Sequence, residues 1–316
     1  MIGLVDALQL LPLRFHLEAH QPIYFPPGKA SNVLRGGFGR SFRSIACAPG
    51  CSSPLTCNFR RECPYACIFE PALDSGPSGL VDAPRPFIFR APHLDGARIA
   101  PGQPFHFDLH LFDLRPQIIA YFITAFQQFA ETGMGPAKGA AQLVVVSILD
   151  ASRRPVGNIY SEGVLRSNVP CPLVQIALLP PAQPITGASI RFLTPTELRK
   201  SQPTAEPPPF VVVLSRLRDR ISNLLTLYGA GKPDFDFSGL SARAQSVTIE
   251  RSALTNRVTS RFSGRSSQEH PIGGFLGTID YAGDLTEFVP FLQAGQWTGV
   301  GRHTVWGNGQ MEIWIR

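Results

Sequence analysis

Two segments of the sequence share one alternating pattern centred on an Arg-Phe pair, and this likeness constrains the fold more than any other feature. Residues 11–20 read LPLRFHLEAH and residues 188–198 read ASIRFLTPTEL, the alternation of a half-buried strand. Each is followed by a proline-containing loop and a helical pattern, at residues 32–46 in the first half and 210–228 in the second. A strand, a loop and a helix at the start of both halves predict a duplicated α+β unit.

Further patterns complete each half. Strands are expected at residues 103–111, 142–149 and 173–178 of the first half, and at residues 244–254, 275–281, 304–306 and 311–315 of the second. Helices are expected at residues 117–132 and 285–294. The simplest fold for each half is the ferredoxin-like, RRM-like βαββαβ unit.

A proline cluster separates the two halves. Pro180, Pro181 and Pro184 follow the last expected strand of the first half and indicate a linker. We therefore expect an N-terminal domain over residues 1–182 and a C-terminal domain over residues 186–316.

The cationic side chains are almost all arginine, which bears on the partner. Arginine supplies 25 of the 29 cations, and the net charge is +6. The planar guanidinium binds phosphate with two hydrogen bonds and stacks on bases, so this bias favours RNA over a membrane. A coding bias toward arginine is the alternative.

The N-terminal segment predicts no export and no membrane span. Residues 1–15 lack a basic leader, and their apolar run is broken by Asp6 and Pro12. No segment has the roughly 18 uncharged apolar residues that a spanning helix needs. We expect a cytoplasmic protein with no membrane partner and with reduced cysteines.

Five of the six cysteines lie within the loop at residues 47–67. Clustered thiols in a reduced protein indicate a metal site that staples the loop. The intervals of three, five, five and three residues are wider than in a zinc knuckle, so both zinc and an iron-sulfur cluster remain open. Unligated thiols are the alternative.

A glycine-rich loop at residues 299–309, GVGRHTVWGNG, is the most informative segment. Glycines let a backbone approach phosphates closely and turn its N–H groups outward. Arg302 and His303 lie at its centre. The loop lacks the Gly-Lys-Ser/Thr of a nucleotide-binding P-loop and the third glycine of a dinucleotide fingerprint. A plain hairpin loop is the alternative.

The motifs around this loop resemble a known family. In order they are RFSGRSSQ (261–268), GGFLG (273–277), DYAGD (280–284), FVPFL (288–292) and the glycine loop. This series closely resembles the C-terminal domain of the RAMP-superfamily endoribonucleases that process precursor CRISPR RNA. SIRFLTPT (189–196) resembles the opening strand of that domain. LRGGFG (34–39) and CPY (63–65) with FE (69–70) resemble the N-terminal half.

The resemblance implies a fold and an activity. It implies two tandem ferredoxin-like domains, with a Cys-rich metal-binding insertion in the first, and CRISPR repeat RNA as partner. It implies cofactor-free cleavage by the ribose 2′-hydroxyl, giving a cyclic phosphate and a 5′-hydroxyl, with retention of the crRNA repeat handle. The alternative is a non-catalytic crRNA-binding RAMP subunit of an effector complex, with other effector subunits as partners. A metal-cluster redox protein would explain neither the arginine bias nor the glycine loop.

The resemblance also selects the metal ligands and shows one departure. The family's cysteine set ends at the Cys-Pro-Tyr step, which implies the ligands Cys47, Cys51, Cys57 and Cys63 and leaves Cys67 spare. The family often has His-Val-Gly-Lys where this chain has Thr298, Gly299, Val300, Gly301 and Arg302. His303 could replace the missing histidine, or the chain could bind without cutting.

Cleavage needs a base, an acid and a cation that balances the phosphorane charge. His303 is one candidate. His20, which ends the first strand, is the other, with Tyr24 to orient it and Lys29 to hold phosphate. A third reading assigns catalysis to neither histidine.

The remaining histidines look structural. Three of them lie in strand patterns and are expected to be satisfied sheet residues, namely His16, His106 and His110. Two lie in polar loops without a clear partner, namely His93 and His270.

Seven arginines and two loop glycines are the expected RNA contacts. They are Arg35, Arg40 and Arg43 near the first helix, Arg257, Arg261 and Arg265 before the Gly-Gly turn, and Arg302 with Gly299 and Gly301 in the glycine loop. Solvated surface charge is the alternative for each arginine taken alone.

Overall fold

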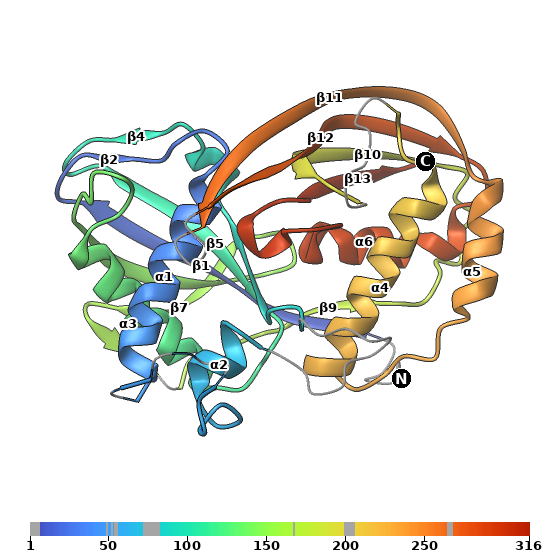
Figure 1. The fold of residues 1–316 in the computed structure, drawn as a ribbon. Coiled ribbons are helices and arrows are strands. Elements are labelled where there is room, and N and C mark those ends of the chain that lie inside the picture. The colour runs from blue at the N-terminus through green and yellow to red at the C-terminus, as the bar shows by residue number, and fades with distance from the viewer. Residues whose placement is uncertain are drawn as a thin grey trace. The chain divides into compact units, whose positions relative to one another are not determined.

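The computed structural model describes most of the chain in two compact units. The described residues are 7–48, 50–51, 53, 56–71, 83–166, 168–198, 206–263 and 268–316, with the backbone alone for 258–263 and 268–272. The N-terminal unit is Gln9–Val174, and the C-terminal unit is Gln175–Arg316 together with Met1–Leu8. Figure 1 shows both units as ribbons.

The N-terminal unit has the βαββαβ order. Its elements are β1 (Ala7–Ala19), α1 (Ala30–Ala46), β3 (Phe87–Arg90), β5 (Pro104–Leu111), α3 (Gln117–Thr132) and β6 (Ala141–Leu149). The antiparallel strands run in the order β3-β5-β1-β6, and the hairpin of β7 (Pro155–Ser161) and β8 (Val164–Leu165) extends the sheet beyond β6. This is the order of a ferredoxin-like sheet.

Short elements fill the connections of this unit. They are β2 (Ile23–Tyr24), which pairs with β4 (Arg98–Ile99), the helix α2 (Pro64–Ile68) and the 3₁₀ turn η3 (Pro92–Leu94). The strand β9 (Val174–Ala177), at the boundary of the two units, pairs with β1.

A cluster of phenylalanines forms the core between this sheet and its helices. Phe38 of α1 stacks on Phe122 of α3 with ring centroids 4.3 Å apart. Gly37 permits the close approach of α1, because a Cβ there would overlap the ring of Phe129. A Cβ at Gly39 would likewise overlap the ring of Phe69, so Gly37 and Gly39 of LRGGFG serve packing in this structure.

The C-terminal unit repeats the βαββαβ order. Its main elements are β10 (Gly187–Thr196), α4 (Phe210–Tyr228), β11 (Thr248–Ser263), β12 (Gln268–Ala282), α6 (Val289–Thr298) and β13 (Met311–Ile315), with the helix α5 (Phe237–Arg243) and 3₁₀ turns at Ala244–Ser246, Thr286–Phe288 and Thr304–Trp306. Its antiparallel strands run in the order β11-β12-β10-β13. Helices α4 and α6 cover one face of this sheet (Figure 1). Both halves are thus ferredoxin-like α+β units, as expected.

The helix α4 buries the face that its sequence pattern predicts. Leu214, Leu217, Ile221, Leu224 and Leu225 are all at most 1% exposed. The chain therefore has a C-terminal core of its own, as a separate domain requires.

Two expected strands are wrong in part. Residues 304–306 form a 3₁₀ turn, because His303 and Gly307 on either side have left-handed backbone angles (φ 61° and 85°) that curl the chain. Residues 244–246 also form a 3₁₀ turn, so the strand begins at Thr248 and runs on to Ser263. In the part of the chain that the structure describes, no helix has the length and apolarity to span a membrane.

Candidate functional site

The glycine-rich loop follows α6 and is tied to the end of β10. The amide of Val300 donates to the carbonyl of Gly309 at 2.9 Å, that of Arg302 to Glu197 at 2.9 Å, and that of Gly309 to Pro195 at 3.0 Å. Gly301 has φ 81°, and a Cβ there would meet the Glu197 carbonyl, so only glycine fits. The loop is a built platform and not a free hairpin end.

These bonds correct one expectation about the loop. The N–H groups of Gly299, Val300, Arg302 and Gly309 bond within the protein and do not face outward. The glycines serve the fold of the loop, and RNA contact by Gly299 and Gly301 stays a prediction. Chemistry at this loop falls to its side chains.

One carboxylate organises the two functional side chains of the loop. Glu197, the residue after β10, faces Arg302 (Oε1 to Nε, 3.6 Å) and His303 (Oε2 to Nε2, 3.6 Å). The side chain of Arg302 is 43% exposed and that of His303 is 22% exposed. A solvent-accessible guanidinium and a held imidazole therefore meet at one acid.

His303 is fixed from a second side. Its ring stacks on Trp306 with centroids 4.3 Å apart and planes 6° from parallel. Its left-handed backbone is uncommon for a residue with a Cβ and costs on the order of 1 kcal/mol. Such strain often accompanies a functional position.

A buried amide lies in the same loop. Asn308 is 7% exposed, and its Nδ2 has no hydrogen-bond partner among the described residues. Buried donors are seldom left unsatisfied, so this amide is an exception to the usual pairing of buried polar groups.

Thr298, where the resembled family often has histidine, is structural here. It is fully buried, and its hydroxyl donates to the carbonyl of Gly299 at 3.0 Å. Its own carbonyl accepts from Nε of Arg220 at 2.7 Å, and burial lowers the pKa of Arg220 to about 10. No catalytic group replaces the histidine at this position.

The second catalytic candidate set is not assembled. His20 is exposed, Tyr24 lies under the guanidinium of Arg98 at 4.6 Å, and Lys29 caps α1. In the described part of the chain, no hydrogen bond or ring contact joins the side chains of His20, Tyr24 and Lys29.

The arginines of α1 have different surroundings. Arg35 lies over the ring of Phe69 at 4.6 Å, and Nη2 of Arg43 donates to the carbonyl of Cys51 at 3.0 Å. Both therefore brace the structure. Arg40 is exposed, and RNA contact by the arginines of α1 stays a prediction.

The second arginine group lies on a long two-stranded ribbon. Arg257 is half-buried in β11 opposite Gly274, and Arg261 pairs in register with His270. The side chains of Arg261 and His270 and all of Arg265 lie outside the described residues. RNA contact by this group stays a prediction.

Three of the clustered cysteines lie near one another. Burial, followed by the neighbouring thiols of Cys63 and Cys51, raises the pKa of Cys47 to about 11. The thiol of Cys63 also lies 3.8 Å from the carbonyl of Ala46. The spare Cys67 instead points to the carbonyl of Arg61 at 3.3 Å.

These positions fit the predicted ligand set only in part. No contact joins Cys57 to the other thiols, and nowhere in the described ranges do three or more His, Cys, Asp or Glu side chains form a group able to hold a metal. The metal site therefore stays a prediction.

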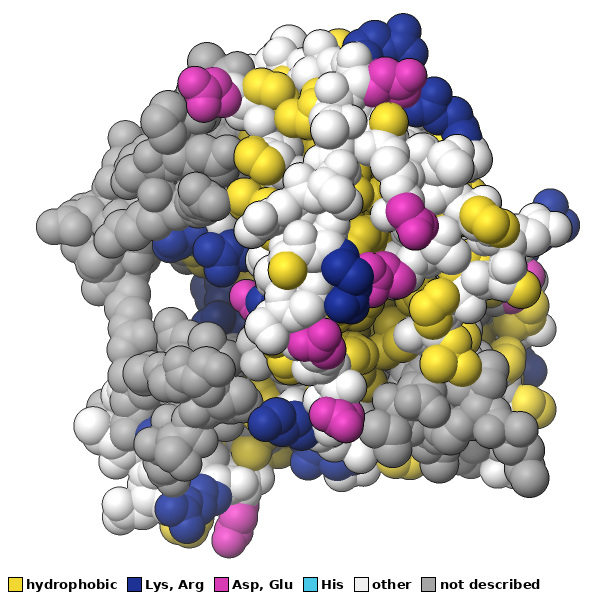
Figure 2. All heavy atoms as spheres, turned by 90° about the vertical axis from the view of Figure 1, so that its right-hand side faces the viewer, with side chains coloured by type: hydrophobic (Ala, Val, Ile, Leu, Met, Phe, Trp, Pro, Cys, Tyr) yellow, Lys and Arg dark blue, Asp and Glu magenta, His cyan; other side chains and the backbone are white. Residues whose placement is uncertain are grey.

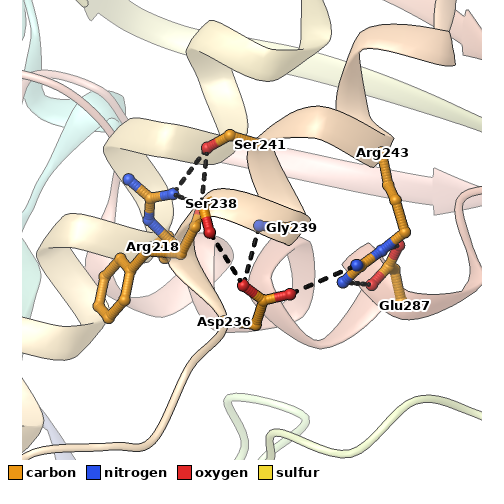
Figure 3. A network of polar contacts seen from close by, with 8 residues as sticks. Arg218, Asp236, Ser238, Gly239, Ser241, Arg243 and Glu287 are labelled. Carbon is orange, nitrogen blue, oxygen red and sulfur yellow. Dashed lines mark hydrogen bonds and ion pairs between the residues drawn. The ribbon is translucent and has the colours of Figure 1, made fainter.

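The helical face of the C-terminal unit has its charges paired. Arg243 binds Glu287 at 2.6 Å and Asp236 at 3.5 Å (Figure 3). Arg218 binds Asp219 at 3.0 Å. Figure 2 shows basic side chains lying beside acidic and apolar ones on this side of the molecule, rather than in one continuous basic surface. These arginines serve the helices, and phosphate contact by Arg302 of the glycine loop stays a prediction.

Comparisons with known proteins agree with this fold. A family model described as the AF_1859_N N-terminal domain matches residues 8–170, and one described as CRISPR-associated endoribonuclease Cas6 matches residues 190–311. A sequence search of curated proteins gives no match.

Solved structures share the fold at low identity. A Cas6 product complex aligns over 97% of this chain and 100% of that chain, with 16% identity and a TM-score of 0.54. Thermus thermophilus Cas6 aligns over 96% and 98%, with 15% identity and a TM-score of 0.52. A partial Cas6-RT-Cas1–Cas2 complex aligns over 98% of this chain and 46% of that chain, with 13% identity and a TM-score of 0.55.

Proposed function

The chain belongs to the AF_1859_N family, whose model matches residues 8–170, and its residues 190–311 match the model of the CRISPR-associated endoribonuclease Cas6 family. From this premise we propose that the chain cuts CRISPR repeat RNA and retains the repeat handle. The cut needs no metal. The 2′-hydroxyl beside the scissile phosphate attacks that phosphate, which leaves a cyclic phosphate and a 5′-hydroxyl.

The observation that carries this proposal is the arrangement of Arg302 and His303 around Glu197. It brings a guanidinium and an imidazole together within the segment that the endoribonuclease family model matches. Phosphate transesterification needs a proton acceptor, a cation and a proton donor for the leaving 5′-oxygen. This arrangement would supply the first two, and water would donate the proton to the 5′-oxygen.

Each side chain has a defined part in the proposed reaction. His303 turns Nε2 toward Glu197, so Nδ1 is the nitrogen that takes the proton of the 2′-hydroxyl. Arg302 opposes the charge that grows on the phosphorane oxygens. Trp306 keeps the imidazole plane from rotating.

His20 is the second candidate base, with Tyr24 and Lys29 beside it in sequence. The geometry favours His303, because its ring is held by a carboxylate and an indole, while His20 is an exposed side chain. Preorganised groups contribute most to catalysis.

The alternative function is a non-catalytic crRNA-binding subunit, and two observations favour it. Thr298 is buried where the resembled family has a histidine. Glu197 already faces Arg302, so a phosphate must compete with it for the guanidinium. In either case we propose repeat RNA or crRNA as the partner, with other effector subunits as further partners.

A structural metal belongs to the proposal as well. Cys47, Cys51 and Cys63 would hold zinc or an iron-sulfur cluster, with Cys57 as the fourth ligand. Because ligating thiols must be deprotonated, a bound cation would reverse the raised pKa of Cys47. The metal would staple the loop after α1 and takes no part in cleavage.

Incubation of the full chain with its repeat RNA in EDTA separates the two functions. One cut with a cyclic-phosphate end supports the endoribonuclease, and tight, salt-sensitive binding without a cut supports the subunit. Arg302→Ala should weaken binding in both cases, whereas Arg216→Ala, an exposed arginine of α4 that faces Asp219, should leave it unchanged. If Arg302→Ala binds as wild type does, Arg302 is not in the site.

A further inference from the structure

One face of the N-terminal sheet carries polar side chains on its two central strands. β1 and β5 are the central pair of the order β3-β5-β1-β6. Phe15 and Phe107 of these strands point to the helices, and their rings stack 5.1 Å apart. Since side chains alternate along a strand, the residues between the phenylalanines belong to the opposite face.

Two histidines lie side by side where this face emerges from the core. His16 of β1 is opposite His106 of β5 in the strand register. Along the same face of β5, His110 is 2% exposed and the side chain of Asp108 is 13% exposed. His16 and His106 are half-buried, and Glu18 beyond them is exposed. Both imidazoles are therefore at the border between core and solvent.

A third histidine extends the row into solvent. His93, in the turn after β3, stacks on His106 with ring centroids 4.4 Å apart, and its Nε2 lies 2.8 Å from the His106 carbonyl. The rings of His106 and His16 are 6.0 Å apart, and Nε2 of His16 lies 3.4 Å from Oγ of Ser147. His93 is exposed, and within the described ranges no ring covers its other side. The expectation that His93 lacks a partner is therefore wrong.

The two sheet imidazoles are uncharged at neutral pH. Burial is the main cause that lowers the pKa of His106 to about 4. The neighbouring His93, Arg14 and His16 lower this pKa further, while the carboxylate of Asp108 raises it. Burial and the nearby charge of Arg14 also lower the pKa of His16, while the carboxylate of Asp108 raises it. These rings are thus flat aromatic surfaces and not cations.

A fixed cation stands next to these rings. Arg14 makes two hydrogen bonds to Asp108, at 2.6 and 2.9 Å, which raise its pKa and keep it charged. Arg90 of β3 lies opposite Asp108 in the register. Arg90 is only 5% exposed, so of these two arginines Arg14, with 22% of its side chain exposed, is the one that a phosphate can reach.

We propose that this face binds single-stranded RNA, with bases stacked on His16 and on His93, which itself lies on His106, and with the RNA phosphates near Arg14. Four-stranded ferredoxin-like sheets of the RRM type stack bases on aromatic residues of their central strands, and imidazoles are among the rings that accept a base. Duplex RNA does not fit, because its bases already stack on one another. The inference rests on the proposed RNA-processing function and adds a site for an unpaired part of the same RNA.

Ring-to-ring substitution is the sharpest test, since it separates stacking from proton transfer. Full-length wild type, His16→Ala/His106→Ala and His16→Phe/His106→Phe are titrated into a fluorescent oligouridine of about eight nucleotides. We expect the alanine pair to bind roughly tenfold more weakly and the phenylalanine pair to bind as wild type, because stacking needs only the ring. His93→Ala, on an exposed turn, should bind more weakly without affecting the fold. Gln142→Ala, on the exposed end of β6, is the matched control.

The outcomes separate this inference from the proposed function. Cleavage of the hairpin repeat RNA is followed in the same preparations. If wild type cuts the repeat but binds oligouridine no better than His93→Ala and the folded alanine pair do, the stacking site is overturned and the proposed function is not. A phenylalanine pair as weak as the alanine pair overturns it as well. Wild type that neither binds nor cuts the repeat overturns the proposed function, whatever oligouridine does.

Discussion

The imidazole of His303 lies flat against the indole of Trp306, with ring centroids 4.3 Å apart and planes 6° from parallel. The two residues lie at the ends of one 3₁₀ turn, in which the amide of Trp306 donates to the carbonyl of His303 at 2.9 Å. Glu197 faces the imidazole edge at 3.6 Å. A histidine held on its face and on its edge keeps one orientation. This relationship is why we assign the base to His303.

Trp306 is therefore a positioning residue, and its replacement should affect rate more than binding. Trp306→Ala should cut repeat RNA about tenfold more slowly, since a freed imidazole loses its alignment. Trp306→Phe keeps a ring and should retain most of the rate. Single-turnover kinetics give the rate and filter binding gives the Kd. Equal losses of rate and affinity in both variants would show that Trp306 only maintains the fold.

Two neighbouring glycines of α1 should respond to alanine in opposite directions. A methyl group at Gly37 would overlap the ring of Phe129, so Gly37→Ala should lower the free energy of unfolding by about 2 kcal/mol. At Gly36 the nearest atom is the end of Arg40 at 3.9 Å, so Gly36→Ala should stabilise by about 0.5 kcal/mol through helix propensity. Denaturant unfolding measures both. Equal effects at the two sites would contradict the packing described for α1.

The stability of the protein should fall on mild acidification because of His106. Its pKa is about 4 in the folded state, while an unfolded histidine titrates near 6.5. Between these values the unfolded chain takes up the proton and the folded chain does not, so the free energy of unfolding decreases as pH falls from about 6.5 to 4. For a fully buried group, this pKa difference would lower the free energy of unfolding by about 3 kcal/mol. Because His106 is half-exposed, we expect a decrease of about 1 kcal/mol.

His106→Phe supplies the control for that titration. It removes the group and keeps a ring, so its unfolding free energy should depend less on pH over the same range than that of wild type. Urea unfolding at about pH 7 and pH 4.5 measures the difference. Identical pH dependence in the two proteins would mean that His106 titrates normally.

Loss of the metal should loosen the loop after α1. If thiols of this loop hold zinc or an iron-sulfur cluster, a chelator or Cys63→Ser should lower the Tm by roughly 5–10 °C. Cys171→Ser, outside the cluster, should leave the Tm unchanged. Metal analysis and visible absorption identify the ion. A protein purified from cells without metal, and insensitive to chelator, would remove the predicted site.

Sequence patterns predicted the regular elements well where periodicity is long. The helices at Gln117–Thr132 and Phe210–Tyr228 have the predicted bounds, because an apolar stripe over many turns leaves one consistent reading. The short helix α5 and the hairpin β7–β8 were not predicted, because segments this short contain too few residues to show a hydrophobic period. Residues 304–306 were predicted wrongly, because the left-handed turn at His303 leaves no mark in hydrophobicity.

The site was predicted for residues adjacent in sequence and missed for residues that the fold brings together. Arg302 and His303 stand in a visible glycine-rich motif. Glu197 lies far from them in sequence, and its only signal is that it follows the strand motif SIRFLTPT. The stack of His16 on His106 depends on the register of β1 and β5, which no local pattern contains.

The most direct test of the central claim is the single-turnover rate of repeat-RNA cleavage in EDTA, measured for wild type, His303→Ala and His20→Ala. With protein in excess over RNA, binding no longer limits the rate. The account predicts a rate at least about a hundredfold lower for His303→Ala, the scale of a lost general base, and a rate near wild type for His20→Ala, with a cyclic-phosphate end on the product. Undiminished cleavage by His303→Ala, or no cleavage by wild type that binds the RNA tightly, would contradict it.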